Sequence, residues 1–134
     1  MIDFGLIRSV IDEATGQHIS FTEGKNLVGT CRYTSVNSHL GYELSRRDDL
    51  IALGYVIIYL IKGQLPWQNI PINKNSARYS TVGRIKSKHR HEKLCESLPL
   101  NFVRYMDYAR GLEFEQHADL NMLKLLVRDM ADEA

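Results

Sequence analysis

Apolar residues dominate the stretch from Leu50 to Ile61, which contains no charged residue. One set recurs at helical spacing, namely Leu50, Leu53, Ile57 and Ile61, and the positions between carry Ile51, Val56, Tyr59 and Leu60. A helix that is apolar on every face is expected to be buried on all sides. It is too short to span a bilayer, which takes about 20 residues.

Polar residues mark both ends of this helix. Ser45, with Asp48 three residues later, has the spacing of a capping box, and an acid is favourable at the positive end of the helix dipole. Gly63 suits the left-handed position that ends a helix, and Pro66 prevents its continuation. The pattern therefore predicts one core helix that begins near residue 46 and ends near residue 62.

The remaining chain alternates loops and shorter helices. Residues 3–37 are rich in Gly, Thr, Ser and Asn and predict loops with short strands. Further helices are predicted over 76–88, with an interruption at Gly83, over 99–108, and from a cap at Asp119 to Met130. The last of these has an expected inward face of Leu120, Leu123, Leu126 and Val127.

Composition restricts the class of protein. The 134 residues are 44% hydrophobic and 25% charged, which is typical of one globular domain and not of a disordered chain. A net charge of +1 argues against a surface that binds nucleic acid in general. Two widely spaced cysteines and the lack of a signal segment predict a reduced, intracellular protein, cytoplasmic or nuclear, with no membrane partner.

The densest basic run extends from Arg84 to His91, and its simplest interpretation is a charged face in water. A metal site made of His89, His91 and Cys95 is not expected, because the usual paired-cysteine spacing and a fourth ligand are both missing.

Several motifs together resemble the casein kinase I family of Ser/Thr protein kinases. The chain contains D-F-G at residues 3–5, K-N-L-V-G-T-C-R-Y-T-S-V-N-S-H-L-G at 25–41, and R-R-D-D-L-I-A-L-G-Y-V at 46–56, followed by G-Q-L-P-W at 63–67. The S-x-N at residues 35–37 stands where most protein kinases have A-P-E. The resemblance implies a mainly α-helical fold, the large-lobe part of a kinase domain, with 1–44 as the activation segment and 45–134 as the helical subdomain.

The resemblance also implies functional residues. Asp3 corresponds to the family's ligand for the Mg²⁺ that accompanies ATP, and Asp49 to an acid that accepts backbone N–H groups from the catalytic loop. Gly29, Arg32 and Arg78 correspond to a pocket for a phosphate or an acidic side chain on the protein substrate. Arginine at position 78 keeps the charge and adds a planar pair of donors suited to phosphate oxygens.

Some family motifs do not occur in the 134 residues. The Gly-rich loop, the strand lysine and the H-R-D loop, which contains the catalytic base, precede D-F-G in the family. The expected function is therefore that of a C-terminal fragment of a casein kinase I-like enzyme, which phosphorylates acidic or primed proteins but is inactive as this chain alone, with no catalytic residue and no bound ATP or Mg²⁺.

Two alternatives remain at this point: a pseudokinase-like or relic module that binds acidic or phosphorylated peptides, and an unrelated helical domain. The fragment is also expected to leave apolar surface uncovered and to fold poorly by itself.

Overall fold

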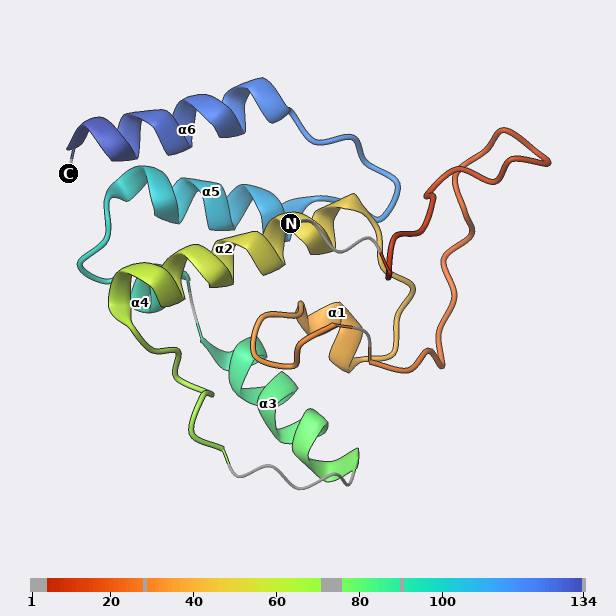
Figure 1. Ribbon diagram of the computed structural model, residues 1–134, viewed down its shortest axis with the longest axis horizontal. Coiled ribbons are helices and arrows are strands. Elements are labelled where there is room, and N and C mark those ends of the chain that lie inside the picture. The colour runs from red at the N-terminus through yellow and green to blue at the C-terminus, as the bar shows by residue number, and fades with distance from the viewer. Residues whose placement is uncertain (1–4, 28, 71–75, 90, 134) are drawn as a thin grey trace.

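The computed structural model describes residues 5–27, 29–70, 76–89 and 91–133, with the backbone alone at 76–80, 91–92 and 133 (Figure 1). Its helices are α1 (Val36–His39), α2 (Arg46–Lys62), α3 (Ser76–Lys88), α4 (His91–Leu94), α5 (Leu100–Gly111) and α6 (Leu120–Glu133). The prediction of a mainly α protein is confirmed. The short strands expected near the N-terminus do not form in the described part, where one antiparallel bridge joins Ile11 and His18.

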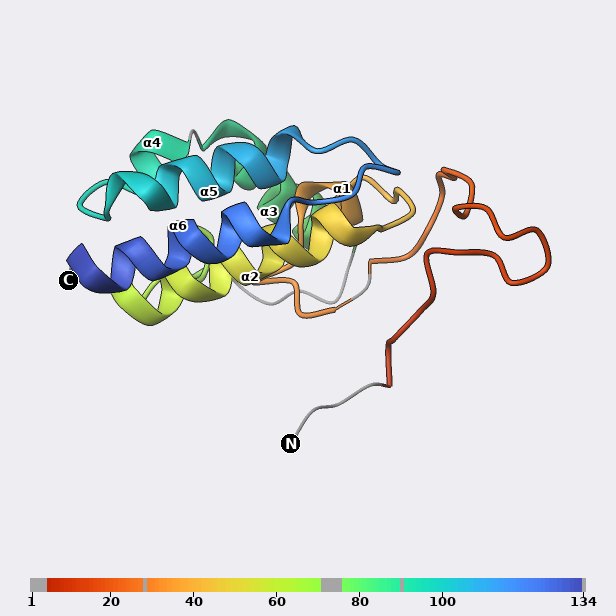
Figure 2. The same ribbon diagram turned by 90° about the horizontal axis from the view of Figure 1, so that it is seen from above.

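Helices α2, α5 and α6 run side by side, and α5 packs against both of the others (Figures 1 and 2). The short α1 packs against α3 on the other side of α2. Loops of the N-terminal region extend away from one end of this body (Figure 2). No helix in the described residues is long and apolar enough to cross a membrane.

The predicted ends of α2 are confirmed. The backbone N–H of Ser45 donates to Oδ2 of Asp48 at 2.8 Å, which is the acidic half of the capping box. Gly63 has a φ of 76° and donates its N–H to the Tyr59 carbonyl at 2.8 Å. Glycine adopts this left-handed conformation at little cost, so the helix ends where the sequence indicated.

The prediction that α2 is buried on all sides is wrong. Its buried face is made by Ile51, Tyr55 and Ile58, whereas Leu53 is 49% exposed and Leu60 is 74% exposed. Helix α5 packs against one face of α2, and Tyr33 and Trp67 pack against Tyr59 and Tyr55 elsewhere on it. Within the described residues, the side that carries Leu53 and Leu60 stays open to solvent. An apolar pattern shows that a face can be buried, but neighbouring elements decide whether it is.

The centre of the core lies between α2 and α5. Phe102, Tyr105 and Met106 are almost fully buried, as the helical spacing predicted. Gly54 permits this packing, because a Cβ at that position would overlap the sulfur of Met106 and lie 3.2 Å from the Tyr105 ring. The Tyr105 hydroxyl donates to the Leu50 carbonyl at 2.8 Å, which fixes the two helices together at one end.

Helix α3 continues through Gly83, so the predicted interruption is wrong. A Cβ on Gly83 would lie 2.7 Å from Cβ of His39, and glycine therefore allows α1 to approach α3 closely.

The predicted cap of α6 is confirmed, because the Met122 N–H donates to Oδ1 of Asp119 at 3.0 Å. Its predicted inward face is only partly buried: Leu123 is 4% exposed, but Leu120 is 56% and Val127 is 38% exposed.

Candidate anion site in the 29–37 segment

Lys86 holds the loop that precedes α1. Its side chain is 1% exposed, and Nζ donates to the carbonyls of Cys31 at 2.7 Å and Thr34 at 2.6 Å. Nζ also lies 3.0 Å from Nε2 of His39. The interpretation of the Arg84–His91 run as a solvated face is therefore wrong at Lys86, which is a buried structural residue.

Aromatic rings complete the surroundings of this amine. Nζ lies 5.4 Å from the centroid of Tyr55 and 5.3 Å from that of Trp67, both within cation–π range. Burial lowers the pKa of Lys86 to about 7, and Cys31 opposes part of that effect. The geometry satisfies both protonation states, because a neutral amine can donate to the two carbonyls and accept from a His39 Nε2–H.

Trp67 provides a second contact to the same loop. Its indole N–H donates to the carbonyl of Arg32 at 2.7 Å, and the side chain is 3% exposed. The backbone carbonyls of residues 31, 32 and 34 are thus bound by side chains from α3 and from the turn after α2. The sequence identified Trp67 as part of a motif but gave no indication of this partner.

Asp48 fixes the next part of the chain, and this contact explains the S-x-N triplet. Oδ1 of Asp48 accepts from the Ser35 hydroxyl at 2.6 Å and from the Asn37 amide at 2.9 Å. Oδ2 accepts from the Ser45 N–H, so one carboxylate serves both the start of α2 and the 29–37 segment. Bonds to an ionised acceptor are among the stronger hydrogen bonds in proteins.

Arg32 lies in the loop between these anchors, and its guanidinium is left with unused donors. The group lies 5.3 Å from the centroid of Tyr59 and 5.9 Å from that of Tyr33, and the residue is half-buried. In the part of the chain that the structure describes, no hydrogen bond or ion pair involves the guanidinium. The two rings lie beside this cation without using its N–H groups, which can donate to an incoming acceptor.

Gly29 lies in the same loop, is exposed, and has a φ of 85°, which favours glycine. Thr30 begins the turn that follows, since its carbonyl accepts the N–H groups of Tyr33 at 3.0 Å and Thr34 at 3.1 Å. Gly29 and Arg32 thus lie in the same loop, three residues apart in the chain. Arg78 belongs to α3, but its side chain lies outside the described residues, so the three-residue pocket stays a prediction.

The two predicted acids differ in what the structure describes. Asp3 lies outside the described residues. Asp49 is exposed at the start of α2, and its carboxylate has no hydrogen-bond or ion-pair partner among them. Burial of part of the group raises the pKa of Asp49, and the neighbouring Asp48 raises it further.

A metal site is not found in the part of the chain described, where no group of three His, Cys, Asp or Glu side chains could hold an ion. Glu43, which the sequence did not indicate, has a structural role. It is 6% exposed and accepts from Arg8 at 2.7 Å and from Thr22 at 3.2 Å.

A search against models of known protein families finds no match for this chain.

Proposed function

We propose that these 134 residues form the activation segment and helical part of a casein kinase I-like Ser/Thr protein kinase, and that the 29–37 segment recognises phosphate or acidic side chains on protein substrates. The observation that supports this most directly is the Arg32 guanidinium, whose donors are unused within a loop that Lys86, Trp67 and Asp48 hold in place. A positioned cation binds an anion with little further loss of conformational freedom.

Phosphoryl transfer itself needs catalytic and nucleotide-binding groups in addition to an anion site. The family's catalytic base, strand lysine and Gly-rich loop are not found in the printed sequence, and Asp3, the expected Mg²⁺ ligand, lies outside the described residues. We therefore expect no transfer from ATP to casein by this chain alone. Transfer clearly above that of an Asp3→Ala variant would contradict this expectation.

The anion site is tested by thermal unfolding in the presence of sulfate and of a phosphoserine peptide. Both should stabilise the wild-type chain, by about 2.7 kcal/mol when the ligand is at 100 times its Kd. Arg32→Ala and Arg78→Ala should each remove most of this gain, and the double variant little more, because the two residues share one ligand.

Arg84→Ala is the matched control, since Arg84 is an exposed arginine on the same helix as Arg78. Equal losses in Arg84→Ala and Arg32→Ala would mean that the anions respond to general positive charge, and the proposed pocket would be wrong.

The second candidate is a module that binds phosphorylated or acidic peptides without catalysis. It is supported by the same loop, because the contacts that hold it come from Trp67 and Lys86, two side chains of this chain. Both candidates predict no transfer by this chain alone, so the coding sequence immediately upstream separates them. An in-frame H-R-D loop and Gly-rich loop there would favour the kinase, and a sequence there without them would select the binding module.

A further inference from the structure

Two tyrosines from different elements flank the guanidinium of Arg32. Its Cζ lies over the ring of Tyr59 in α2, 5.3 Å from the centroid, and over the ring of Tyr33 in the loop, 5.9 Å from the centroid. Both distances are within the range of a cation–π contact. The two rings also meet edge to face, with centroids 5.8 Å apart and planes at 70°, so each ring limits the movement of the other.

The tyrosines are themselves held in place. Both are half-buried and pack against the hydrophobic core, and Tyr59 belongs to a helix whose two ends are capped. The N–H of Tyr33 donates to the Thr30 carbonyl at 3.0 Å, and the carbonyl of Arg32 accepts from Trp67 at 2.7 Å. The backbone of Arg32 is therefore held by hydrogen bonds, and its side chain by the two rings.

The rings, and not the phenol hydroxyls, make these contacts. Among the described residues, the hydroxyls of Tyr33 and Tyr59 form no hydrogen bond. Phenylalanine at either position would keep the ring that faces Arg32, whereas leucine would remove it. The chain thus allows the contribution of the rings to be measured separately from that of the hydroxyls.

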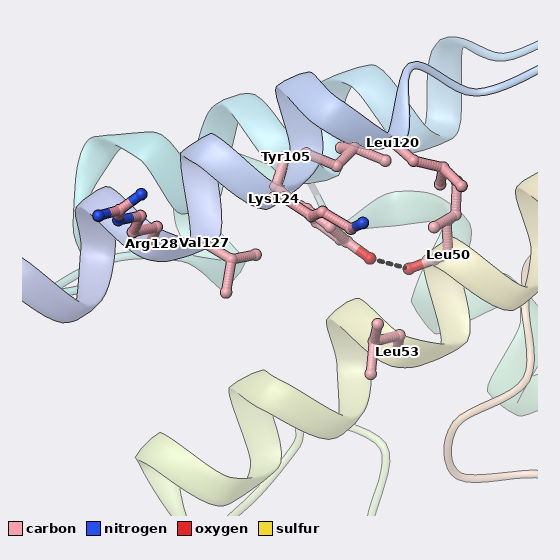
Figure 3. Close-up of a pocket in the computed structure, with 8 residues that line it drawn as sticks. Leu50, Leu53, Tyr105, Leu120, Lys124, Val127 and Arg128 are labelled. Carbon is pink, nitrogen blue, oxygen red and sulfur yellow. Dashed lines mark hydrogen bonds between the residues drawn. The ribbon is translucent and has the colours of Figure 1, made fainter.

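Arg128 provides a comparison with an arginine that lacks such rings. It is exposed on α6, at the edge of the apolar hollow between α2 and α6 (Figure 3). In the described part of the chain, no aromatic ring lies within cation–π range of its guanidinium. An anion that bound there would have to order a long side chain, which weakens binding by about two- to tenfold. Arg32 is already ordered before a ligand arrives.

From these contacts we propose that Tyr59 and Tyr33 are positioning residues for the anion site, whose rings hold the Arg32 guanidinium in the orientation in which its N–H groups receive the ligand. This role rests on the function proposed for the 29–37 segment, and it adds a preference among ligands. A planar guanidinium in a fixed orientation presents two parallel donors, which match two oxygens of one phosphate, sulfate or carboxylate group. The site should therefore prefer such oxyanions to chloride.

The test uses the 134-residue chain with sulfate and chloride at matched ionic strength. The dissociation constant for sulfate is obtained from the rise in the free energy of unfolding, with each variant compared with its own value in chloride. Tyr59→Leu should weaken sulfate binding by about two- to tenfold, whereas Tyr59→Phe should bind as the wild type does. Tyr33→Leu and Tyr33→Phe give the same comparison without a change in α2.

Two further measurements separate positioning from general packing. Tyr42→Leu makes the same change at another half-buried tyrosine, whose ring packs against that of Phe21 and, among the described cation–π contacts, has none with Arg32. It should leave the affinity for sulfate unchanged. Nitrogen relaxation at Nε of Arg32, measured by NMR, should show an ordered side chain in the wild type and in Tyr59→Phe, and a mobile one in Tyr59→Leu.

The proposal fails if Tyr59→Leu and Tyr33→Leu both bind sulfate as tightly as the wild type, or if Tyr42→Leu weakens binding as much as they do. It also fails if Tyr59→Phe is as weak as Tyr59→Leu, because the hydroxyl and not the ring would then be responsible. A wild-type chain that sulfate stabilises no more than chloride would overturn the proposed anion site, and this role with it. The two kinds of failure are distinguishable, since the first is seen only in a wild type that binds sulfate.

Discussion

Helix α2 is in contact with the 29–37 segment on one side and with α5 on another, but different interactions hold these two regions in place. Polar side chains with fixed geometry position the segment: Lys86 binds two carbonyls, and Asp48 binds a serine and an asparagine. Apolar packing around Phe102 and Met106 holds α2 against α5. Polar contacts need particular atoms at particular distances, whereas apolar packing needs mainly volume and shape.

This difference affects what each region can do. The polar anchors keep a loop in one conformation and leave the Arg32 donors unused, which suits recognition of an anion. The apolar helices leave a hollow between α2 and α6 and the exposed Leu53 and Leu60, an apolar surface suited to packing against a further part of the proposed lobe. Each variant below changes one of the two regions, and the measurement shows whether the other region is affected as well.

The largest effect is expected from Phe102→Ala. Phe102 is 0% exposed at the contact of α5 with α2, and removing a buried phenyl ring typically costs about 3–5 kcal/mol. Because α2 carries both regions, the free energy of unfolding should fall and both should unfold together. Urea unfolding followed by tryptophan fluorescence measures this, since Trp67 is buried in the core. A loss below about 1 kcal/mol would mean that this packing is not central.

The second-largest loss of stability is expected from Asp48→Asn. The amide keeps the volume but loses the charge and one acceptor, so one of the donors Ser35, Asn37 and the Ser45 N–H is left without a partner. We expect a loss of about 2–3 kcal/mol in the free energy of unfolding. The neighbouring Asp49→Asn, at an exposed carboxylate without a partner among the described residues, is the matched control and should change stability little. Equal effects would show that Asp48 acts through general charge at the helix start.

Lys86→Met tests the segment more locally. Methionine replaces most of the buried volume but leaves the Cys31 and Thr34 carbonyls without their donor, at a cost of about 1–3 kcal/mol. Amide hydrogen exchange should increase in residues 30–40 and remain unchanged in α5 and α6. Lys88→Met, at an exposed lysine two residues later, should leave the exchange pattern as in the wild type. Faster exchange in α5 as well would mean that the two regions form a single cooperative unit.

The same lysine predicts a pH dependence. Its pKa is about 7 in the folded chain against 10.5 ordinarily, so between these values the unfolded chain binds a proton that the folded chain does not. The contribution of Lys86 to the free energy of unfolding should therefore rise with pH, by at most about 1.4 kcal/mol per unit. The free energy of unfolding is measured as a function of pH for the wild type and for Lys86→Met, and the difference between the two curves isolates this slope. Parallel profiles between pH 7 and 10 would contradict a lowered pKa.

The smallest effect is expected on the open side of α2. Leu60 is 74% exposed, so Leu60→Ser should change the free energy of unfolding by no more than about 0.5 kcal/mol. Ile58→Ser, two residues earlier on the buried face, should cost several times more. A large loss in Leu60→Ser would indicate that another element covers this side of α2 in solution.

Much of the fold follows from local sequence. The ends of α2 were predictable because Ser45, Asp48 and Gly63 act within one helical turn. The buried positions of α5 were predictable from periodicity, because Phe102 and Met106 repeat at helical spacing. Arg32 and Gly29 entered the candidate site through the resemblance to the kinase family, and the structure adds the contacts that hold their loop.

Only the tertiary structure decided which apolar and charged residues are buried. Lys86 and Arg84 belong to the same basic run, yet one is 1% exposed and the other faces solvent, because Trp67, Tyr55 and two loop carbonyls meet at Lys86. Leu53 and Ile51 are equally apolar, yet α5 covers only the face that contains Ile51. Local sequence fixes the period and the ends of a helix through interactions within a few residues. Burial depends on partners outside the helix, such as Cys31, which lies 55 positions from Lys86, and no pattern within a single helix encodes them.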